Sequence, residues 1–145
     1  MATTAFANLY ARITGPVVLL VGILGIVSQA TGYYGYFGDS RTDTSAFLLW
    51  DYTHSAIHVG LGIAAIAAGY FTLISPLLFA RVIGAVYVVL GVLGFVNGDL
   101  FVGASLGGLH VELGENIIHL ALGAAGLVAG FLVLGKTSDK RKTAA

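Results

Sequence analysis

The chain has 145 residues and no net charge, and 57% of its residues are hydrophobic whereas only 10% are charged. Soluble domains carry about 25% charged residues, so this chain has too little charge to cover a water-exposed surface. The mean hydropathy of +0.92 points the same way. There is no basic face for nucleic acid, and the absence of cysteine excludes disulfides, thiolate metal sites and a cysteine nucleophile.

The first apolar segment covers residues 10–30, close to the roughly 20 residues that a helix needs to cross a bilayer. A signal peptide is the competing interpretation, with Arg12 as its basic region and residues 28–30 as a small-x-small cleavage site. We interpret the segment as a spanning helix because its length fits the bilayer.

Three more apolar segments of spanning length follow, over residues 52–74, 77–95 and 113–134. Turn signals separate them, at Ser75-Pro76 and at Asn97-Gly98-Asp99. The apolar residues 100–109 are too few to span and are assigned to the membrane interface. The lipid bilayer is the expected environment, and the predicted fold is a single all-α membrane domain, residues 1–145, with four transmembrane helices and a basic tail over residues 135–145.

The basic residues predict the orientation. In a four-span arrangement, Arg12, Arg81 and the four basic residues of the tail fall on one side, and only Arg41 falls on the other. The positive-inside rule then places both termini in the cytoplasm, for a protein of the plasma (inner) membrane. The second and fourth helices accordingly begin at the outer side.

The two halves of the chain resemble each other. Residues 10–74 align with residues 77–134, at an offset of 61 for the second and fourth segments and 69 for the first and third. The most informative matches are Arg12 with Arg81, His58 with His119, and the acids and glycines around them. The halves share one topology, so we expect two tandem helical hairpins related by a pseudo-twofold axis along the membrane normal.

Two polar octets, residues 51–58 and 112–119, open the second and fourth segments. Positions three, four and seven apart lie on one helix face, so each octet presents three ligand-capable side chains together. We expect both faces to converge near the outer membrane boundary. Carboxylates and imidazoles on facing helices hold transition metals in bundles, with Fe, Mn and Zn all suitable. The predicted metal ligands are Asp51, His54, His58, Glu112, Glu115 and His119.

A purely structural role is the alternative. Acids at a helix start offset the positive end of its dipole, which suits Asp51 and Glu112, and histidines can hydrogen-bond across membrane helices. His58 and His119 lie furthest inside the apolar segments, where ionisable groups mark functional sites. For His54 and Glu115 the structural and the functional interpretation are about equally favoured. His110 lies outside the repeat register, and we assign it to a loop.

The segments His58-x3-Gly62 and Asn116-x2-His119-x3-Gly123 resemble a family of four-span bacterial membrane proteins called domain of unknown function 4383. The resemblance covers residues 12–134 and places His54 and Glu115 at motif positions too. The chain departs from the family pattern at Asp51, Ser55 and Glu112, where Asn is expected, and has Glu115 in place of Asp. The family's name assigns no function, so the resemblance implies architecture only.

Three functions remain open. The leading hypothesis is a non-enzymatic accessory or structural subunit, in a homo-oligomer or a larger membrane complex, whose polar cluster binds a metal ion or a polar ligand. The second is a b-type haem protein with His58 and His119 as axial ligands, although a haem needs a large gap in so small a bundle. The third is a small transporter or proton relay. The sequence argues against this function, because no row of polar residues continues from the cluster to the cytoplasmic side. No catalytic residues are predicted, since hydrolase and nucleotide motifs are absent.

Overall fold

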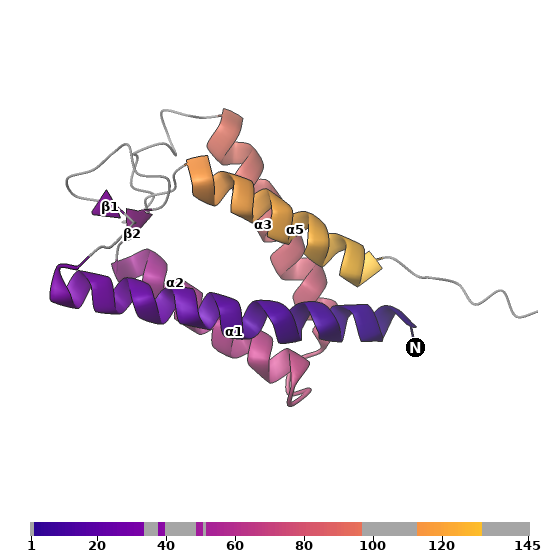
Figure 1. Cartoon of the computed structure of the whole chain (residues 1–145). Coiled ribbons are helices and arrows are strands. Elements are labelled where there is room, and N and C mark those ends of the chain that lie inside the picture. The colour runs from indigo at the N-terminus through magenta and orange to yellow at the C-terminus, as the bar shows by residue number, and fades with distance from the viewer. Residues whose placement is uncertain (1, 34–37, 40–48, 51, 97–112, 132–145) are drawn as a thin grey trace, which may run out of the picture.

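The computed structural model describes residues 2–33, 38–39, 49–50, 52–96 and 113–131, and helices make up nearly all of this part (Figure 1). The helices are α1 (Ala2–Thr31), α2 (Tyr52–Gly69), α3 (Pro76–Val96) and α5 (Leu113–Phe131). Two short strands, β1 (Gly38–Asp39) and β2 (Leu49–Trp50), pair in parallel. The predicted all-helical architecture with four long helices is confirmed.

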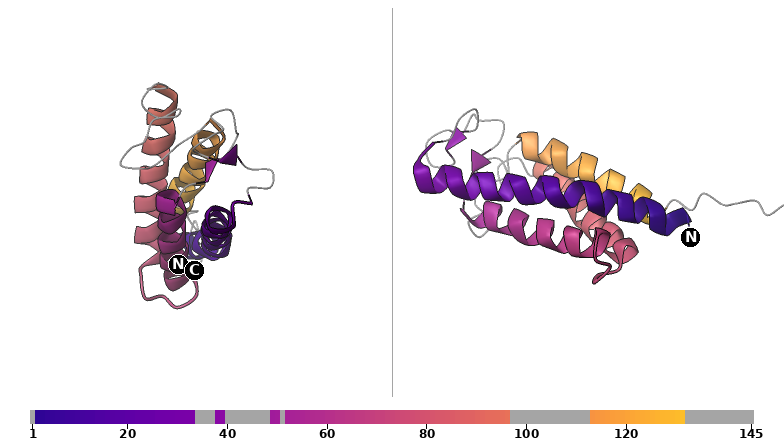
Figure 2. Two further views of the ribbon diagram at one scale, coloured as in Figure 1. Left: turned by 90° about the vertical axis from the view of Figure 1, so that its left-hand side faces the viewer. Right: turned by 60° about the horizontal axis from the view of Figure 1, so that its bottom comes forward.

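The four helices form two pairs (Figure 1). The indigo helix α1 packs along α2, and α3 packs along α5, whereas fewer contacts join one pair to the other. Two further views show that the pairs lie at an angle to each other (Figure 2). The hydroxyl of Tyr10 on α1 links the pairs, because it donates a hydrogen bond of 3.2 Å to the carbonyl of Leu122 on α5.

Glycine allows the two helices of each pair to approach closely. A Cβ atom added to Gly62 on α2 would lie 2.5 Å from the backbone nitrogen of Leu19 on α1. A Cβ atom added to Gly123 on α5 would lie 2.6 Å from the backbone nitrogen of Val88 on α3. Lipid tails provide no hydrophobic drive between helices, so close backbone contact of this kind supplies the packing.

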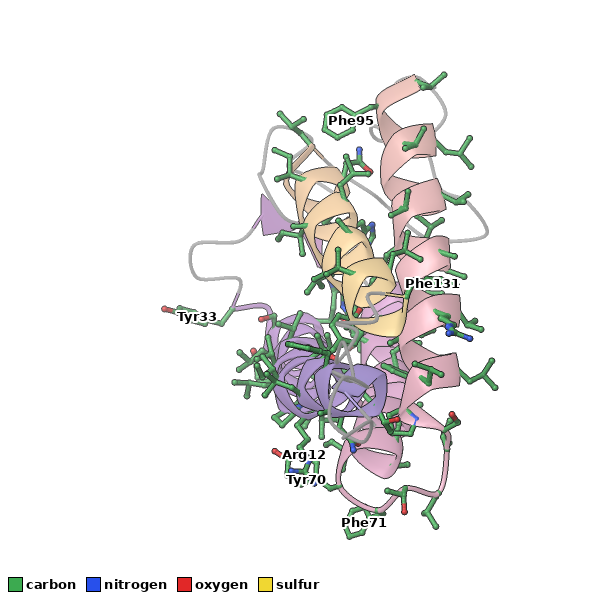
Figure 3. The ribbon with its side chains drawn as sticks, turned by 90° about the vertical axis from the view of Figure 1, so that its right-hand side faces the viewer. Arg12, Tyr33, Tyr70, Phe71, Phe95 and Phe131 are labelled. Atoms are coloured by element: carbon green, nitrogen blue, oxygen red, sulfur yellow. The ribbon has the colours of Figure 1, made fainter. Side chains whose placement is uncertain are left out.

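The interior is built from small residues and the exterior from large ones. Six alanines are buried around Tyr10 and Phe79, namely Ala7, Ala11, Ala65, Ala68, Ala80 and Ala129. Large aliphatic side chains, among them Leu20 and Val89, are more than half exposed, and the side chains project outward from the helices in Figure 3. An apolar exterior of this extent is unlike that of a soluble protein and indicates a lipid bilayer as its surroundings.

Three of the described helices are long and apolar enough to cross a membrane, over Thr4–Thr31, Pro76–Val96 and Leu113–Phe131. The helix α2 is not among them, since its 18 residues include His54 and His58. It also ends at Gly69, five residues before the predicted end of the second apolar segment. The prediction of one helix over residues 52–74 was wrong at this end, because the apolar residues after Gly69 form the turn that leads to α3.

The start of α3 has an ordinary capping signal. The hydroxyl of Ser75 accepts a hydrogen bond of 3.3 Å from the backbone N–H of Leu78. This is the N-cap arrangement, and Pro76 occupies the first helical position, where its missing N–H costs nothing. Before it, Thr72 has a φ of 53°, a left-handed conformation that is incompatible with a continuing helix.

Arginines tie together the ends of each helix pair that lie away from the strands. Arg12 Nε donates a hydrogen bond of 2.7 Å to the carbonyl of Gly69, and Arg81 Nε donates one of 2.9 Å to the carbonyl of Gly130. Each guanidinium also lies over the aromatic ring that follows its glycine, Tyr70 or Phe131. A cation near the last carbonyls of a helix offsets the negative end of its dipole. Figure 3 shows Arg12 and Tyr70 next to each other.

Pro16 explains one further contact at this end. It lies inside α1, and without a backbone N–H it cannot donate to the carbonyl of Arg12, four residues earlier. The hydroxyl of Tyr70 donates to this carbonyl instead, over 3.3 Å. Pro16 would leave the carbonyl of Arg12 without a donor, and Tyr70, which directly follows α2, supplies that donor.

Candidate functional site

Four ionisable side chains meet between the two helix pairs. His54 and His58 come from α2, and Glu115 and His119 come from α5. In each helix the two residues are four positions apart, so they lie on one face, one turn above the other. They surround a cavity of about 190 Å³ to which all four helices contribute. The other lining residues are Val17, Val18, Val21, Ser55, Tyr87, Ile118 and Leu122.

The three histidines are close enough to share an ion. One ring nitrogen from each of His54, His58 and His119 can be chosen so that all three lie within 4.8 Å of one another. The ring centroids of His54 and His58 are 4.4 Å apart, and those of His54 and His119 are 6.2 Å apart. Zinc–nitrogen bonds of about 2.0–2.1 Å place tetrahedral ligands a little over 3 Å apart. Shortening the largest of these separations by about 1.5 Å would therefore bring the histidines into a metal's first coordination sphere.

Glu115 is bound to a histidine. His54 Nδ1 lies 3.2 Å from Glu115 Oε1, and the two side chains are only 8% and 7% exposed. At this distance Nδ1–H can donate to the carboxylate, in which case Nε2 is the ring atom of His54 that can face an ion. Histidine ligands usually donate their second ring N–H to a carboxylate in this way, which fixes the tautomer and the ring orientation. Glu115 Oε1 is therefore placed to orient the ring of His54.

His119 is held by stacking. The ring of Tyr87 on α3 lies parallel to the imidazole of His119, with centroids 5.0 Å apart and an interplanar angle of 15°. His119 Nδ1 is buried and has no hydrogen-bond partner in the described part of the protein. A buried nitrogen without a partner is costly, and a lone pair held in this way suits a metal ligand.

Two further buried polar side chains have no hydrogen-bond partner among the described residues, Ser55 and Asn116. Ser55 is 1% exposed and lines the cavity. Asn116 is equally buried but packs against Gly94 and the neighbouring Gly91 on α3, outside the cavity lining. Of these two, only Ser55 can act on a molecule in the cavity.

The predicted cluster is only partly described. Of the six proposed ligands, the structure brings together His54, His58, Glu115 and His119, which the sequence had placed on two converging faces. Asp51 and Glu112 lie outside the described residues, as does His110.

Tyr87 and Ser55 line the cavity, but neither was predicted from the sequence as a site residue. A signal for Tyr87 was available, because it is the only hydroxyl-bearing residue between Arg81 and Asn97, in the third apolar segment. A hydroxyl in the middle of a spanning segment is unusual enough to suggest a polar neighbour.

The family model for a domain of unknown function, DUF4383, matches residues 8–132. The chain belongs to this family. The resemblance inferred from the two histidine motifs is thereby confirmed, and the DUF4383 match contains all four described members of the cluster. No curated protein and no solved structure matches the chain.

The cavity of this DUF4383 chain is small for an organic cofactor. Pockets for drug-sized ligands have volumes of roughly 300–1,000 Å³, whereas this one has about 190 Å³. A haem between His58 and His119 would also have to displace His54, whose ring centroid lies 4.4 Å from that of His58. Three imidazoles around a small cavity suit a single ion such as zinc, copper, iron or nickel.

Proposed function

We propose that His54, His58 and His119 bind one transition-metal ion inside a four-span membrane protein, and that Glu115 orients His54. The observation that carries this proposal is the triad itself, with three imidazoles from two helices within 4.8 Å of one another. Ionisable side chains at membrane depth are costly and are kept for function. Imidazole is the commonest metal ligand in proteins, and three of them leave one tetrahedral position open.

A duplicated hairpin explains why the site has this form. Several equivalent residues make equivalent contacts in the two helix pairs. Gly62 lies against Leu19 as Gly123 lies against Val88, and Gly69 binds Arg12 as Gly130 binds Arg81. These matches support a pseudo-twofold relation between the pairs, with His58 and His119 as its symmetry mates. On this view the metal lies near the axis, where each half contributes ligands.

The arginines help to place the site in the bilayer. In the proposed topology both termini are cytoplasmic, so Arg12 and Arg81 mark the inner boundary, as the positive-inside rule favours. His58 and His119 each precede by eleven residues the glycine that binds one of these arginines. At 1.5 Å per residue this is about 16 Å along the helix, near the middle of a hydrocarbon core of roughly 30 Å. His54, one turn further out, faces the outer half.

The metal site is proposed to serve a non-enzymatic subunit of a homo-oligomer or a larger membrane complex. The exposed faces of α1 and α3 carry long rows of aliphatic residues, which can contact either lipid or another membrane helix. The triad would then stabilise the junction of the two helix pairs, and a bound ion would stabilise only the folded state.

Metal analysis of the purified protein tests this proposal. We expect one equivalent of a divalent metal, measured by mass spectrometry after purification in detergent and dialysis against Zn²⁺ or Co²⁺. His58→Ala and His119→Ala should each lose that equivalent, because the two remaining imidazoles alone bind a metal ion weakly. The variant His110→Ala is the matched control, since it removes the one histidine that lies outside the two octets. Removal of metal by a chelator should lower the melting temperature of the wild type and of His110→Ala, but not that of His58→Ala or His119→Ala.

Wild-type protein that binds no stoichiometric metal, and that melts at the same temperature with and without added ions, would overturn the proposal. Full metal content in both His58→Ala and His119→Ala would do so as well.

A further inference from the structure

We infer that the metal ion's remaining coordination position opens into the cavity and takes a small monoanion, hydroxide or one of similar size, with the hydroxyl of Ser55 donating a hydrogen bond to it. The inference rests on the proposed metal site and deepens it by naming the exogenous ligand. It is carried by three observations: the number of available donors, the charge of the cavity and the position of Ser55.

The described residues offer three donors rather than four. The ligand atoms come from His54, His58 and His119, and Glu115 is held by His54 Nδ1. Tyr87 lies flat against the ring of His119. The remaining described lining residues, apart from Ser55, are aliphatic. A zinc ion with three protein ligands keeps its fourth position for water or substrate, whereas closed structural sites have four protein ligands.

Charge balance determines what fills that position. The histidines bind a metal as neutral imidazoles, so a divalent ion together with Glu115, the one carboxylate among the described lining residues, has a net charge of about +1. Five aliphatic side chains, all valine, isoleucine or leucine, line the cavity beside the polar cluster, and an uncompensated charge in such buried surroundings is costly. One monoanion makes the site neutral. Metal-bound water meets this need when it becomes hydroxide near neutral pH, with its proton released to solvent.

Ser55 is placed to hold this ligand. It lines the cavity beside His54, is 1% exposed, and its Oγ has no hydrogen-bond partner in the described part of the chain. Ser55 and His58 are three residues apart on α2, so both face the same side of the helix. A serine hydroxyl can donate one hydrogen bond, and an anion in the cavity supplies the acceptor that Ser55 lacks.

Azide titration of the Co²⁺-loaded protein tests the inference. Azide is a monoanion of suitable size, and the visible absorption of Co²⁺ reports both coordination number and ligand exchange. We expect azide to shift the spectrum of the wild type in a saturable manner. The variant Ser55→Ala should retain Co²⁺ but bind azide about tenfold more weakly, as expected for the loss of a hydrogen bond to a charged group. The control Thr53→Ala, which removes an exposed hydroxyl from the same helix, should leave the azide affinity unchanged.

The outcomes separate the two proposals. A wild-type protein that binds no Co²⁺ removes the proposed metal site, and the exogenous ligand with it. A Co²⁺ spectrum that azide does not change leaves the metal site intact and overturns the open position, because a protein ligand then occupies it. An azide affinity in Ser55→Ala equal to that of the wild type overturns the role of Ser55.

Discussion

The two helix pairs are alike at one end and different at the other. At the end bearing the arginines, Arg12 binds the carbonyl of Gly69 and Arg81 binds that of Gly130, at 2.7 and 2.9 Å. Toward the opposite end, His54 of α2 occupies the position that Glu115 occupies in α5 by the offset of 61 residues. Packing is thus repeated between the pairs, whereas the chemistry at the cavity is not.

This difference has a direct electrostatic consequence. Two identical pairs would bring His54 against a second histidine, or Glu115 against a second glutamate. Two buried carboxylates in contact would repel each other. Two imidazoles in contact would have no carboxylate between them to orient either ring. With one residue of each kind, His54 Nδ1 and Glu115 Oε1 pair with each other, 3.2 Å apart. The unlike residues at these two positions supply the oriented imidazole that the proposed metal site needs.

The largest expected effect comes from removing this difference. His54→Glu places a second carboxylate against Glu115, and we expect it to destabilise the protein by about 3–5 kcal/mol, as for breaking a buried ion pair. The double variant His54→Glu/Glu115→His exchanges the two residues and should recover most of the loss. Unfolding in detergent, followed by circular dichroism, measures both. A double variant that is no more stable than His54→Glu would contradict the pairing.

An intermediate effect is expected where the pairs are alike. In Gly62→Ala the new methyl group meets the backbone of Leu19, and backbone cannot move aside without separating α1 from α2. We expect a loss of about 1–3 kcal/mol, as for an overpacked core, and a similar loss for Gly123→Ala in the other pair. The measurement is the same unfolding experiment.

Gly60 supplies the matched control for this prediction. It lies on the same helix, but nothing lies within 4 Å of a Cβ atom added to it. Gly60→Ala should therefore leave stability unchanged or raise it by up to about 1 kcal/mol, because alanine favours the helix. If Gly62→Ala behaved as Gly60→Ala does, the close contact between α1 and α2 would be refuted.

The smallest expected effect concerns a difference at the otherwise similar end. Tyr70→Phe removes the hydroxyl that donates a hydrogen bond to the carbonyl of Arg12. Pro16 cannot replace this donor, because it has no backbone N–H. We expect a loss of about 0.5–1.5 kcal/mol, near the lower limit because Tyr70 is half exposed. Phe131→Tyr should change stability by less than about 0.5 kcal/mol, since Ala85 has the N–H that Pro16 lacks. Equal effects in the two variants would show that Pro16 creates no need for the tyrosine.

The sequence predicted the helices better than their ends. Apolar composition located all four, because spanning length and hydropathy depend on composition alone. It placed the end of the second helix at residue 74 rather than at Gly69, since apolar residues such as Phe71 and Leu73 read alike in a helix and in a turn within or near the membrane. The positive φ of Thr72 has no counterpart in the hydropathy pattern.

The proximity of four members of the predicted cluster was foreseen, but not the contacts that they make with one another. Helical spacing placed His54, His58, Glu115 and His119 on two converging faces, because periodicity alone decides which residues share a face. It could not show that His54 and Glu115 bind each other, since this depends on the relative rotation of α2 and α5. For the same reason the stacking of Tyr87 was out of reach of sequence reasoning.

The arrangement in two closely packed pairs implies an order of assembly during synthesis. The contacts of α1 with α2 join neighbouring stretches of the chain, so the first pair can form as soon as both helices have entered the bilayer. The contacts of Tyr10 with Leu122 and of His54 with Glu115 bridge distant stretches and form only when the second pair docks onto the first. The cavity is therefore completed only after α5 has been made, because His54 and His58 come from α2 whereas Glu115 and His119 come from α5.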